Sequence, residues 1–247
     1  MAPSPDPEFC DHLVRITVTE GAQPDDGEIA LFNAIKNRRT DRSAYFMEDL
    51  PRDLMSGCRD IVESAGASVL FFEDSASVEG IANLVAEGDR LQFDDPSFRR
   101  ELASWIHASR LGSGDGMSGS GFNMPDVFTP AAGFMIRTFD IGSGVAAADE
   151  KKILGGSPAL ALLVNPSDTA EDWLNTGRAL AKMLLTLTSA GYSASYLNQP
   201  IEVAALRLKL AKIAGVSGFP QILLRVGRSA ENPGPSMRRK LSDVILT

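Results

Sequence analysis

The sequence predicts an α+β protein in which helices cover a sheet of short buried strands. Continuous apolar runs at residues 68–73, 159–165 and 220–227 have the length and composition of buried strands. Between these runs, apolar residues recur at three- and four-residue steps, which is the spacing of helices with one buried face. The chain has 247 residues, enough to bury a sizeable core.

The amino-terminal half predicts one further strand and four helices. The expected elements are a strand at 12–18, helices at 25–39 and 51–66, and two helices within 75–106 that are separated by a break at 94–97. Either Asp25 or Asp26 can cap the first helix. Its carboxyl end carries the stretch "IKNRRTDRSAYF", which is unusually rich in arginine.

The segment from about 111 to 156 shows no periodicity and contains the Gly- and Ser-rich stretch "LGSGDGMSGSGFNMP". It is not a phosphate-binding P-loop, because no Gly-Lys-Ser/Thr closes it and no strand precedes it. A loop of this length in a compact domain is either a flexible insert or a lid over a site. Both interpretations stay open.

The carboxyl-terminal half predicts a long helix after the strand at 159–165. Ser167 or Asp168 can cap this helix, and Gly191 ends it. Apolar residues cover much of its circumference, so we expect burial on more than one face. The elements expected after it are a short strand within 192–200, an amphipathic helix at 200–215 and the strand at 220–227.

The chain is acidic, with 24 Lys and Arg residues against 32 Asp and Glu residues and a formal net charge of -8. This balance argues against nucleic acid or an anionic membrane as the main partner, because both favour a basic surface. No apolar run is long enough to span a membrane, and the start lacks the pattern of a signal peptide. The two cysteines, Cys10 and Cys58, suit a reducing compartment. We therefore expect a cytoplasmic protein.

The motifs of several enzyme classes are missing. The sequence has no G-x-S-x-G elbow, no H-E-x-x-H and no G-x-G-x-x-G between a strand and a helix, and it has only two histidines. Paired carboxylates occur, but solvated loop and cap positions explain them. No acid, base, nucleophile or metal cluster stands out, so we assign no catalytic side chain and no metal ligand.

Two basic clusters remain. Arg38, Arg39 and Arg42 follow the first helix, and Arg238, Arg239 and Lys240 lie near the carboxyl terminus. Arginines at a helix end offset the helix dipole, by about 0.3–1 kcal/mol each, and a basic tail is often only solvated. Alternatively, guanidinium groups from both clusters bind one phosphate, since they match its oxygens in bidentate fashion.

The order of several motifs resembles the flavin-dependent nitroreductases. "RRTDRSAYF" resembles the signature that opens this family, and "DWLNTGRALAKMLLTLTSAGYSASYLNQPIEV" resembles its long central helix and the strand after it. "GFPQILLRVGRS" and "PSMRRKLSDVI" resemble its closing strand and carboxyl-terminal basic pair. Within this family, the motifs are most similar to those of the Acg-like branch. The resemblance implies a single nitroreductase-like domain over 1–247, with a central mixed sheet, a long central helix and the insert or lid at about 111–156.

The resemblance also implies an FMN site. Arg38, Thr40 and Arg42, with Arg39 between them, match the positions that hold FMN in the family. Arg239, with Arg238 beside it, matches the position that takes the phosphate. The residues that would face the flavin ring are Ser195, Tyr196, Leu197 and Asn198. A cation at the N1/O2 edge of the flavin stabilises the reduced ring, and Arg42 or Arg38 would supply it.

The function implied is that of an oxidoreductase that passes electrons from NAD(P)H through FMN to a nitro, quinone or similar acceptor. A homodimer is also implied, because the family commonly places the flavin at a dimer interface. The S-x-x-N-x-Q-P-W segment that completes the flavin pocket in the family is missing here. Two alternatives therefore stay open: a flavin-sequestering or regulatory protein with little turnover, and a scaffold that has lost the flavin.

Overall fold

A computed structural model of the chain describes residues 2–3, 14–107, 116–118, 128–231 and 239–245. Its centre is a four-stranded sheet with the order β3-β6-β8-β7. The bounds of these strands are Ser68–Phe72 for β3, Ala159–Asn165 for β6, Ser193–Tyr196 for β7 and Phe219–Gly227 for β8. The apolar runs of the sequence therefore form the strands that were expected of them.

All the pairings within this sheet are antiparallel, including Leu162 opposite Leu70 on one side and opposite Leu223 on the other. The strand β7 pairs with β8 in the same sense. The family resemblance in the sequence implied a mixed sheet, with parallel as well as antiparallel strands. Among the described residues, the parallel part of this sheet is one isolated bridge, between Thr40 and Ala194 of β7.

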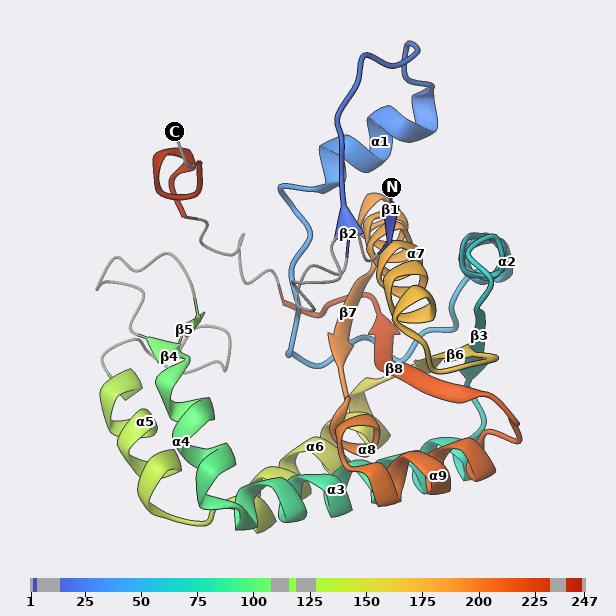
Figure 1. Cartoon of the computed structure of the whole chain (residues 1–247). Helices are drawn as coiled ribbons and strands as arrows, with labels where there is room; N and C mark the ends of the chain where they lie inside the picture. Colours follow the sequence, from blue (N-terminus) through green and yellow to red (C-terminus); the bar gives the residue numbers. More distant parts are fainter. Residues whose placement is uncertain (1, 4–13, 108–115, 119–127, 232–238, 246–247) are drawn as a thin grey trace.

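Helices cover both faces of the sheet (Figure 1). The bounds of the covering helices are Arg52–Glu63 for α2, Ser75–Asp94 for α3, Gly142–Gly156 for α6, Ala170–Ser189 for α7 and Ala204–Ile213 for α9. One core cluster joins α2 and α7 to the sheet, and the other joins α3, α6 and α9 to its opposite face. Every residue of β6 is buried, because successive side chains enter alternate clusters. This explains why its sequence is apolar throughout rather than alternating.

The long helix α7 starts one residue later than the sequence suggested. Thr169 is the N-cap, and its hydroxyl and the carboxylate of Asp172 each accept a hydrogen bond from the other residue's backbone N–H. Gly191 follows the helix with φ +82°, a conformation that favours glycine, and Tyr192 N–H donates to the Leu187 carbonyl. The exposed end of the shorter α1 (Asp26–Ala34) is capped in the same way by Asp25 and Glu28.

The expectation of a continuous loop over 111–156 is wrong for its second half. Residues 129–138 form α5, and residues 142–156 form α6, which lies along α3. Residues 111–115 and 119–127 lie outside the described residues. Small residues explain the error: a Cβ on Gly142 would lie 2.8 Å from Phe93 Cβ, and one on Gly156 would lie 3.1 Å from Ala44 Cβ. Close helix packing by glycine and alanine leaves no stripe of large apolar residues.

Other expected elements change in their bounds. The strand expected at 12–18 is reduced, within the described residues, to β2 (Val14–Arg15), which pairs with β1 (Ala2–Pro3). The helix expected at 200–215 divides at Val203 into α8 (Gln199–Glu202) and α9. The break between α3 and α4 (Pro96–Ser104) falls at Asp95, as expected. A second small sheet pairs β4 (Ile106–His107) with β5 (Met117–Ser118).

Two helix glycines provide a matched test of the packing between α3 and α8. A Cβ on Gly88 of α3 would lie 2.7 Å from Gln199 Cβ, whereas a Cβ on Gly57 of α2 would meet nothing within 4 Å. We expect Gly57→Ala to raise the free energy of unfolding by about 0.5–1 kcal/mol through helix propensity. Gly88→Ala should lower it by about 1–3 kcal/mol through overpacking. Urea denaturation measures both, and stabilisation by both substitutions would contradict this packing.

Candidate functional site

The arginine-rich segment leaves α1 and runs beside the edge strand β7. Asn37 N–H and Arg38 N–H both donate to the Ala34 carbonyl, which closes the helix. Thr40 then forms the parallel bridge to Ala194, and Asp41 N–H donates to the Ala194 carbonyl over 3.2 Å. The segment therefore extends the sheet beyond β7.

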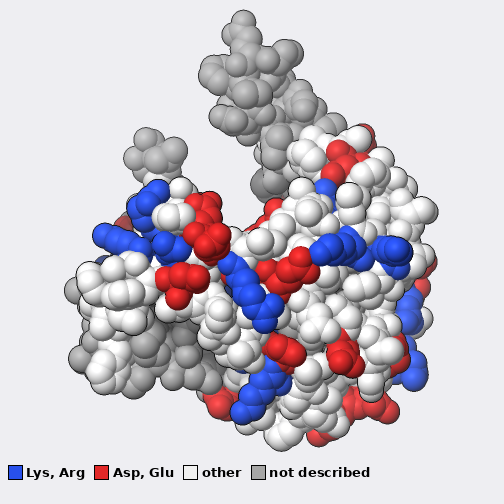
Figure 2. Space-filling model, turned by 90° about the horizontal axis from the view of Figure 1, so that it is seen from below, with Lys and Arg blue, Asp and Glu red and all other residues white. Residues whose placement is uncertain are grey.

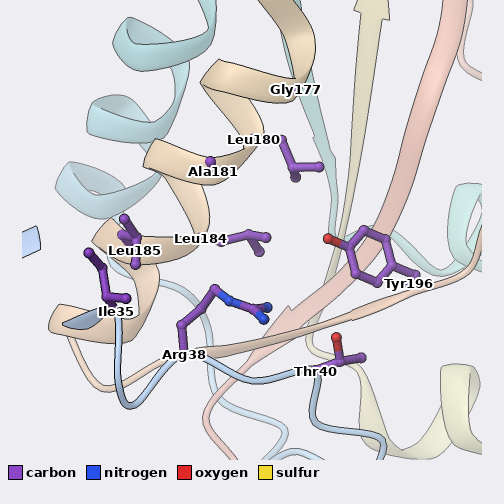
Figure 3. Close-up of a pocket in the computed structure, with 9 residues that line it drawn as sticks. All are labelled: Ile35, Arg38, Thr40, Gly177, Leu180, Ala181, Leu184, Leu185 and Tyr196. Carbon is purple, nitrogen blue, oxygen red and sulfur yellow. The ribbon is translucent and has the colours of Figure 1, made fainter. Parts of the chain in front are cut away.

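A pocket of about 510 Å³ opens where this segment faces the side of α7. Arg38 and Thr40 line it from the segment, and Tyr196 lines it from the end of β7, with the three side chains converging in Figure 3. The other lining residues are Ile35, Gly177, Leu180, Ala181, Leu184 and Leu185. An apolar wall with one cation and two hydroxyls beside it suits a ligand that has both a flat apolar part and an anionic part.

Of the four candidates in and just after β7, at 195–198, Tyr196 alone is among the residues that line this pocket. Ser195 and Leu197 are buried, whereas Tyr196 is 38% exposed. Asn198 has a structural partner, because its Oδ1 accepts a hydrogen bond from Leu223 N–H over 3.0 Å. Successive side chains of a strand point to opposite faces, so Tyr196 faces the pocket while Ser195 is buried. The family resemblance did not indicate which of these side chains would face a ligand.

The three arginines of the segment have different surroundings. Arg38 lines the pocket, while Arg39 is half-buried and its charge acts on Asp41. Burial lowers the pKa of Arg42, and the nearby carboxylate of Asp149 in α6 acts against that shift. A solvated helix end would leave all three in water, so the structure does not support that interpretation for Arg42.

The segment is anchored by a buried arginine that the sequence analysis did not single out. Arg225 of β8 is 1% exposed, and its Nη2 donates to the Ser43 carbonyl over 2.7 Å and to the Asp41 carbonyl over 3.2 Å. Its guanidinium carbon lies 4.3 Å from the centre of the Tyr45 ring. Burial lowers the pKa of Arg225, and the charges of Tyr45, Asp149 and Asp41 oppose that shift. The only sequence signal was an arginine inside an otherwise apolar strand.

Asp41 completes the anchor. Ser43 donates to its Oδ1 from both the backbone N–H and the hydroxyl, over 3.0 and 2.6 Å, and Tyr45 donates its hydroxyl to the Asp41 carbonyl over 2.7 Å. Burial raises the pKa of Asp41, but hydrogen bonds from Ser43 and Ser229 and the charge of Arg39 outweigh it. The net result is a pKa below the ordinary value. The carboxylate is therefore ionised at neutral pH and fixes the turn.

A second buried polar cluster lies where α3, α6 and α8 meet, and sequence reasoning missed it. Gln199 Nε2 donates to Asp89 Oδ1 over 3.0 Å and to Asp149 Oδ2 over 3.5 Å. Asp89 is 2% exposed. Burial, with the charge of Asp149 as the next cause, raises the pKa of Asp89 to about 7. The cluster adjoins Arg42 through Asp149.

In the carboxyl-terminal cluster, the described residues Arg239 and Lys240 are not among those that line the pocket. Arg238 lies outside the described residues. Arg239 is exposed, and its Nη2 donates to the Asp243 carbonyl over 2.7 Å within the tail. Figure 1 shows the red turn Leu241–Asp243 standing apart from α7 and β7. A phosphate site shared by the two clusters stays a prediction.

Charge on the surface is mixed on the face that Figure 2 shows, where basic and acidic side chains lie interspersed. Among the described residues, no group of three or more His, Cys, Asp or Glu side chains is arranged to hold a metal ion. None of the described helices is both long enough and apolar enough to cross a membrane.

Arg225, buried in β8, and Arg228, at the surface just after β8, provide a matched pair of substitutions. Arg225→Met removes the donor to the buried Ser43 carbonyl and one of the two donors to the Asp41 carbonyl, so we expect a loss of about 2–4 kcal/mol in the free energy of unfolding. Arg228 pairs with Glu48 at the surface, with about half of each side chain exposed. Arg228→Met should therefore cost less than about 1 kcal/mol. Urea denaturation measures both, and equal losses would contradict the anchoring role of Arg225.

Comparisons with known proteins agree with one another, although no protein-family model matches the chain. The chain is 30% identical over 248 residues to "Putative NAD(P)H nitroreductase Rv3131" of Mycobacterium tuberculosis strain H37Rv, covering 98% of this chain and 68% of that protein. The protein MT3217 of strain CDC 1551 gives the same values.

Solved structures share the fold at low identity. The FMN-dependent nitroreductase NfnB from Mycobacterium smegmatis, solved with NADPH, has a TM-score of 0.54 at 15% identity, covering 89% of this chain and 98% of that one. A nitroreductase with bound FMN from Bacteroides fragilis also has a TM-score of 0.54 at 15% identity, covering 88% and 97%. Together with the sequence relatives, these likenesses show that the chain belongs to the nitroreductase family.

Proposed function

We propose that this chain binds FMN in the pocket between the arginine-rich segment and α7, and acts as an NAD(P)H-dependent oxidoreductase of nitroreductase type. The observation that carries the proposal is the meeting of Arg38, Thr40 and Tyr196 around one pocket in a member of this family. Relatives are named as NAD(P)H nitroreductases, and fold neighbours are described as FMN-dependent or FMN-bound.

The described residues fit this cofactor. The Arg38 guanidinium and the Thr40 hydroxyl are donors suited to phosphate and ribityl oxygens. Leu180 and Leu184 give the wall apolar surface, and Tyr196 adds an aromatic ring. A volume of about 510 Å³ lies within the range of cofactor sites. Bound FMN supplies the electron transfer, so the protein's part is to hold the ring, exclude water and supply positive charge.

Arg38 and Arg42 would have separate tasks in this site. Arg38 faces the pocket and would bind the anionic part of the cofactor. Arg42 is partly buried beside Asp149, and its charge would favour the reduced ring. The acceptor is a nitro or quinone-like compound, and the protein would act in the cytoplasm.

Removing both cations tests the cofactor site. The double variant Arg38→Ala/Arg42→Ala should bind FMN at least about 100-fold more weakly, because the Arg38 guanidinium can donate two hydrogen bonds to phosphate oxygens and hydrogen bonds to charged groups contribute about 1.5–3 kcal/mol each. Arg52→Ala is the matched control, since Arg52 lies on α2 with its side chain 83% exposed. FMN retention is measured by visible absorption and by chromatography of the heat-released flavin. Unchanged retention by the folded double variant would overturn the assignment.

Steady-state oxidation of NADPH with a quinone separates the enzyme from a flavin-sequestering protein built on the same site. Sustained turnover by the bound flavin supports the oxidoreductase. A single reduction without turnover supports sequestration. A colourless protein that fails to bind added FMN supports neither function.

We also propose a homodimer formed through α1. Three apolar side chains project from the helix and its end: Ile29 is 44% exposed, Phe32 is 70% exposed and Ile35 is 49% exposed. Ile35 also lines the pocket, so this surface continues into the site. Apolar side chains grouped in this way are typical of protein interfaces, and symmetric dimers are the commonest oligomers.

The dimer is tested by measuring mass in solution. We expect twice the 26.4 kDa of one chain for the wild type and a shift towards monomer for Phe32→Ser. Leu208→Ser is the control, because Leu208 is 77% exposed on α9, on the opposite side of the sheet. A monomeric wild type would refute the dimer.

A further inference from the structure

The long helix α7 contains a glycine that the fold does not require. Gly177 lies in the interior of this helix, and a Cβ built on it would meet nothing within 4 Å. Its backbone is helical and does not have a positive φ. Glycine in the interior of a helix is less favourable than alanine, because it has more backbone freedom to lose on folding. Neither close packing nor backbone conformation therefore explains the glycine at this position.

Other glycines in helices differ from Gly177 in their surroundings. A Cβ on Gly88 would lie 2.7 Å from Gln199 Cβ, so this glycine is needed for close packing. Gly57 of α2 is as open as Gly177, but it does not line the pocket. Gly177 combines open space with a place in the wall of the pocket that Arg38 also lines. An unfavourable residue at such a wall indicates that the space above it is used by a ligand.

The pocket has two chemically different ends along α7. Gly177 is about two helical turns from Leu184 and Leu185, which is about 10–12 Å along the axis. In Figure 3, Arg38 and Thr40 lie towards the end of the pocket that Leu185 marks, whereas Gly177 lies at the opposite end. A ligand whose anionic group binds at Arg38 therefore reaches the glycine with its uncharged part.

We propose that the flat ring system of the ligand lies against α7 at Gly177, and that the missing side chain at this position provides the room for it. The inference rests on the proposed function, in which Arg38 binds the anionic part of FMN. Ala181, one turn further along the helix, adds only a methyl group to the same wall. Leu180 and Tyr196 supply apolar and aromatic surface beside it. Gly177 is therefore a specificity-determining residue, which selects a flat ring by leaving the helix backbone uncovered.

Side chains at position 177 should stabilise the fold and weaken ligand binding. Gly177→Ala should raise Tm by about 1–4 °C, because alanine is favoured in helices and the space around it is open. Gly177→Leu should bind FMN at least about tenfold more weakly than the wild type, because its side chain occupies the place of the ring. Its Tm should be no lower than that of the wild type, since leucine is also a good helix former.

Gly57→Leu is the matched control, because it makes the same change at an open helix position outside the pocket. Its affinity for FMN should equal that of the wild type. Fluorescence titration with FMN measures the affinity, and thermal denaturation of the flavin-free proteins measures Tm. If the wild type binds FMN and Gly177→Leu binds it equally well, the inference is refuted and the cofactor site stands. A wild type that binds no FMN overturns both.

A series of substitutions separates a steric role from a structural one. The loss of FMN affinity should grow with side-chain size, from Gly177→Ala through Gly177→Val to Gly177→Leu. Helix propensity has a different order, because leucine is more favourable in a helix than valine. An affinity that follows helix propensity rather than size would show that Gly177 acts through the stability of α7, and would overturn the inference.

Riboflavin, which has the ring of FMN without its phosphate, tests which part of the ligand lies at the glycine. Gly177→Leu should weaken the binding of riboflavin and of FMN by the same factor, whereas Arg38→Ala should weaken FMN more than riboflavin. If Gly177→Leu weakens FMN alone, the phosphate lies at the glycine and the inference is wrong. The mass in solution of Gly177→Leu should equal that of the wild type. A shift towards monomer would show that a second chain occupies this position of α7, and would also overturn the inference.

Discussion

The site depends on one buried interaction between the sheet and the segment that follows α1. Arg225 enters the core from β8, and its guanidinium binds the backbone carbonyls of Asp41 and Ser43. A charged group is costly to bury unless its donors are satisfied, so this arginine fixes the course of the segment wherever the strand is formed. The same contacts hold the backbone on both sides of Arg42, and so they fix the position from which the Arg42 side chain extends. The sheet therefore determines the geometry of the proposed cofactor site, because it holds the backbone of the arginine-rich segment.

Much of the fold could be predicted because the decisive elements have local signals. β6 is apolar throughout since both of its faces are buried, and α7 carries a capping residue at one end and a glycine with positive φ at the other. The region of α5 and α6 could not be predicted in this way. Its packing uses Gly142 and Gly156, whose value lies in the absence of a side chain against Phe93 and Ala44. Periodicity methods detect large apolar residues, so a helix held by small ones is read as a loop.

For the proposed site, the sequence suggested which residues take part but not which way their side chains point. The sequence identified Arg38, Thr40 and Arg42, and the resemblance gave them a ligand. It did not indicate that Arg38 faces the pocket while Arg42 lies beside Asp149, because that depends on how the segment bridges to Ala194. The carboxylate of Asp149, whose charge acts on Arg42, comes from α6, far from the arginine-rich segment in the chain. No local pattern in the sequence connects Asp89 and Asp149 with Gln199.

An acidic protein that holds an anionic cofactor must keep its positive charge local. Here two of the three arginines of the segment interact with a carboxylate: Arg39 with Asp41, and Arg42 with Asp149. These carboxylates weaken the attraction of the arginines for any anion. They also allow the arginines to be partly buried, where the field of the guanidinium groups is less screened than in water. The net attraction for an anion is the difference between the attraction of the arginines and the repulsion of the carboxylates, so protonation of one carboxylate would increase it.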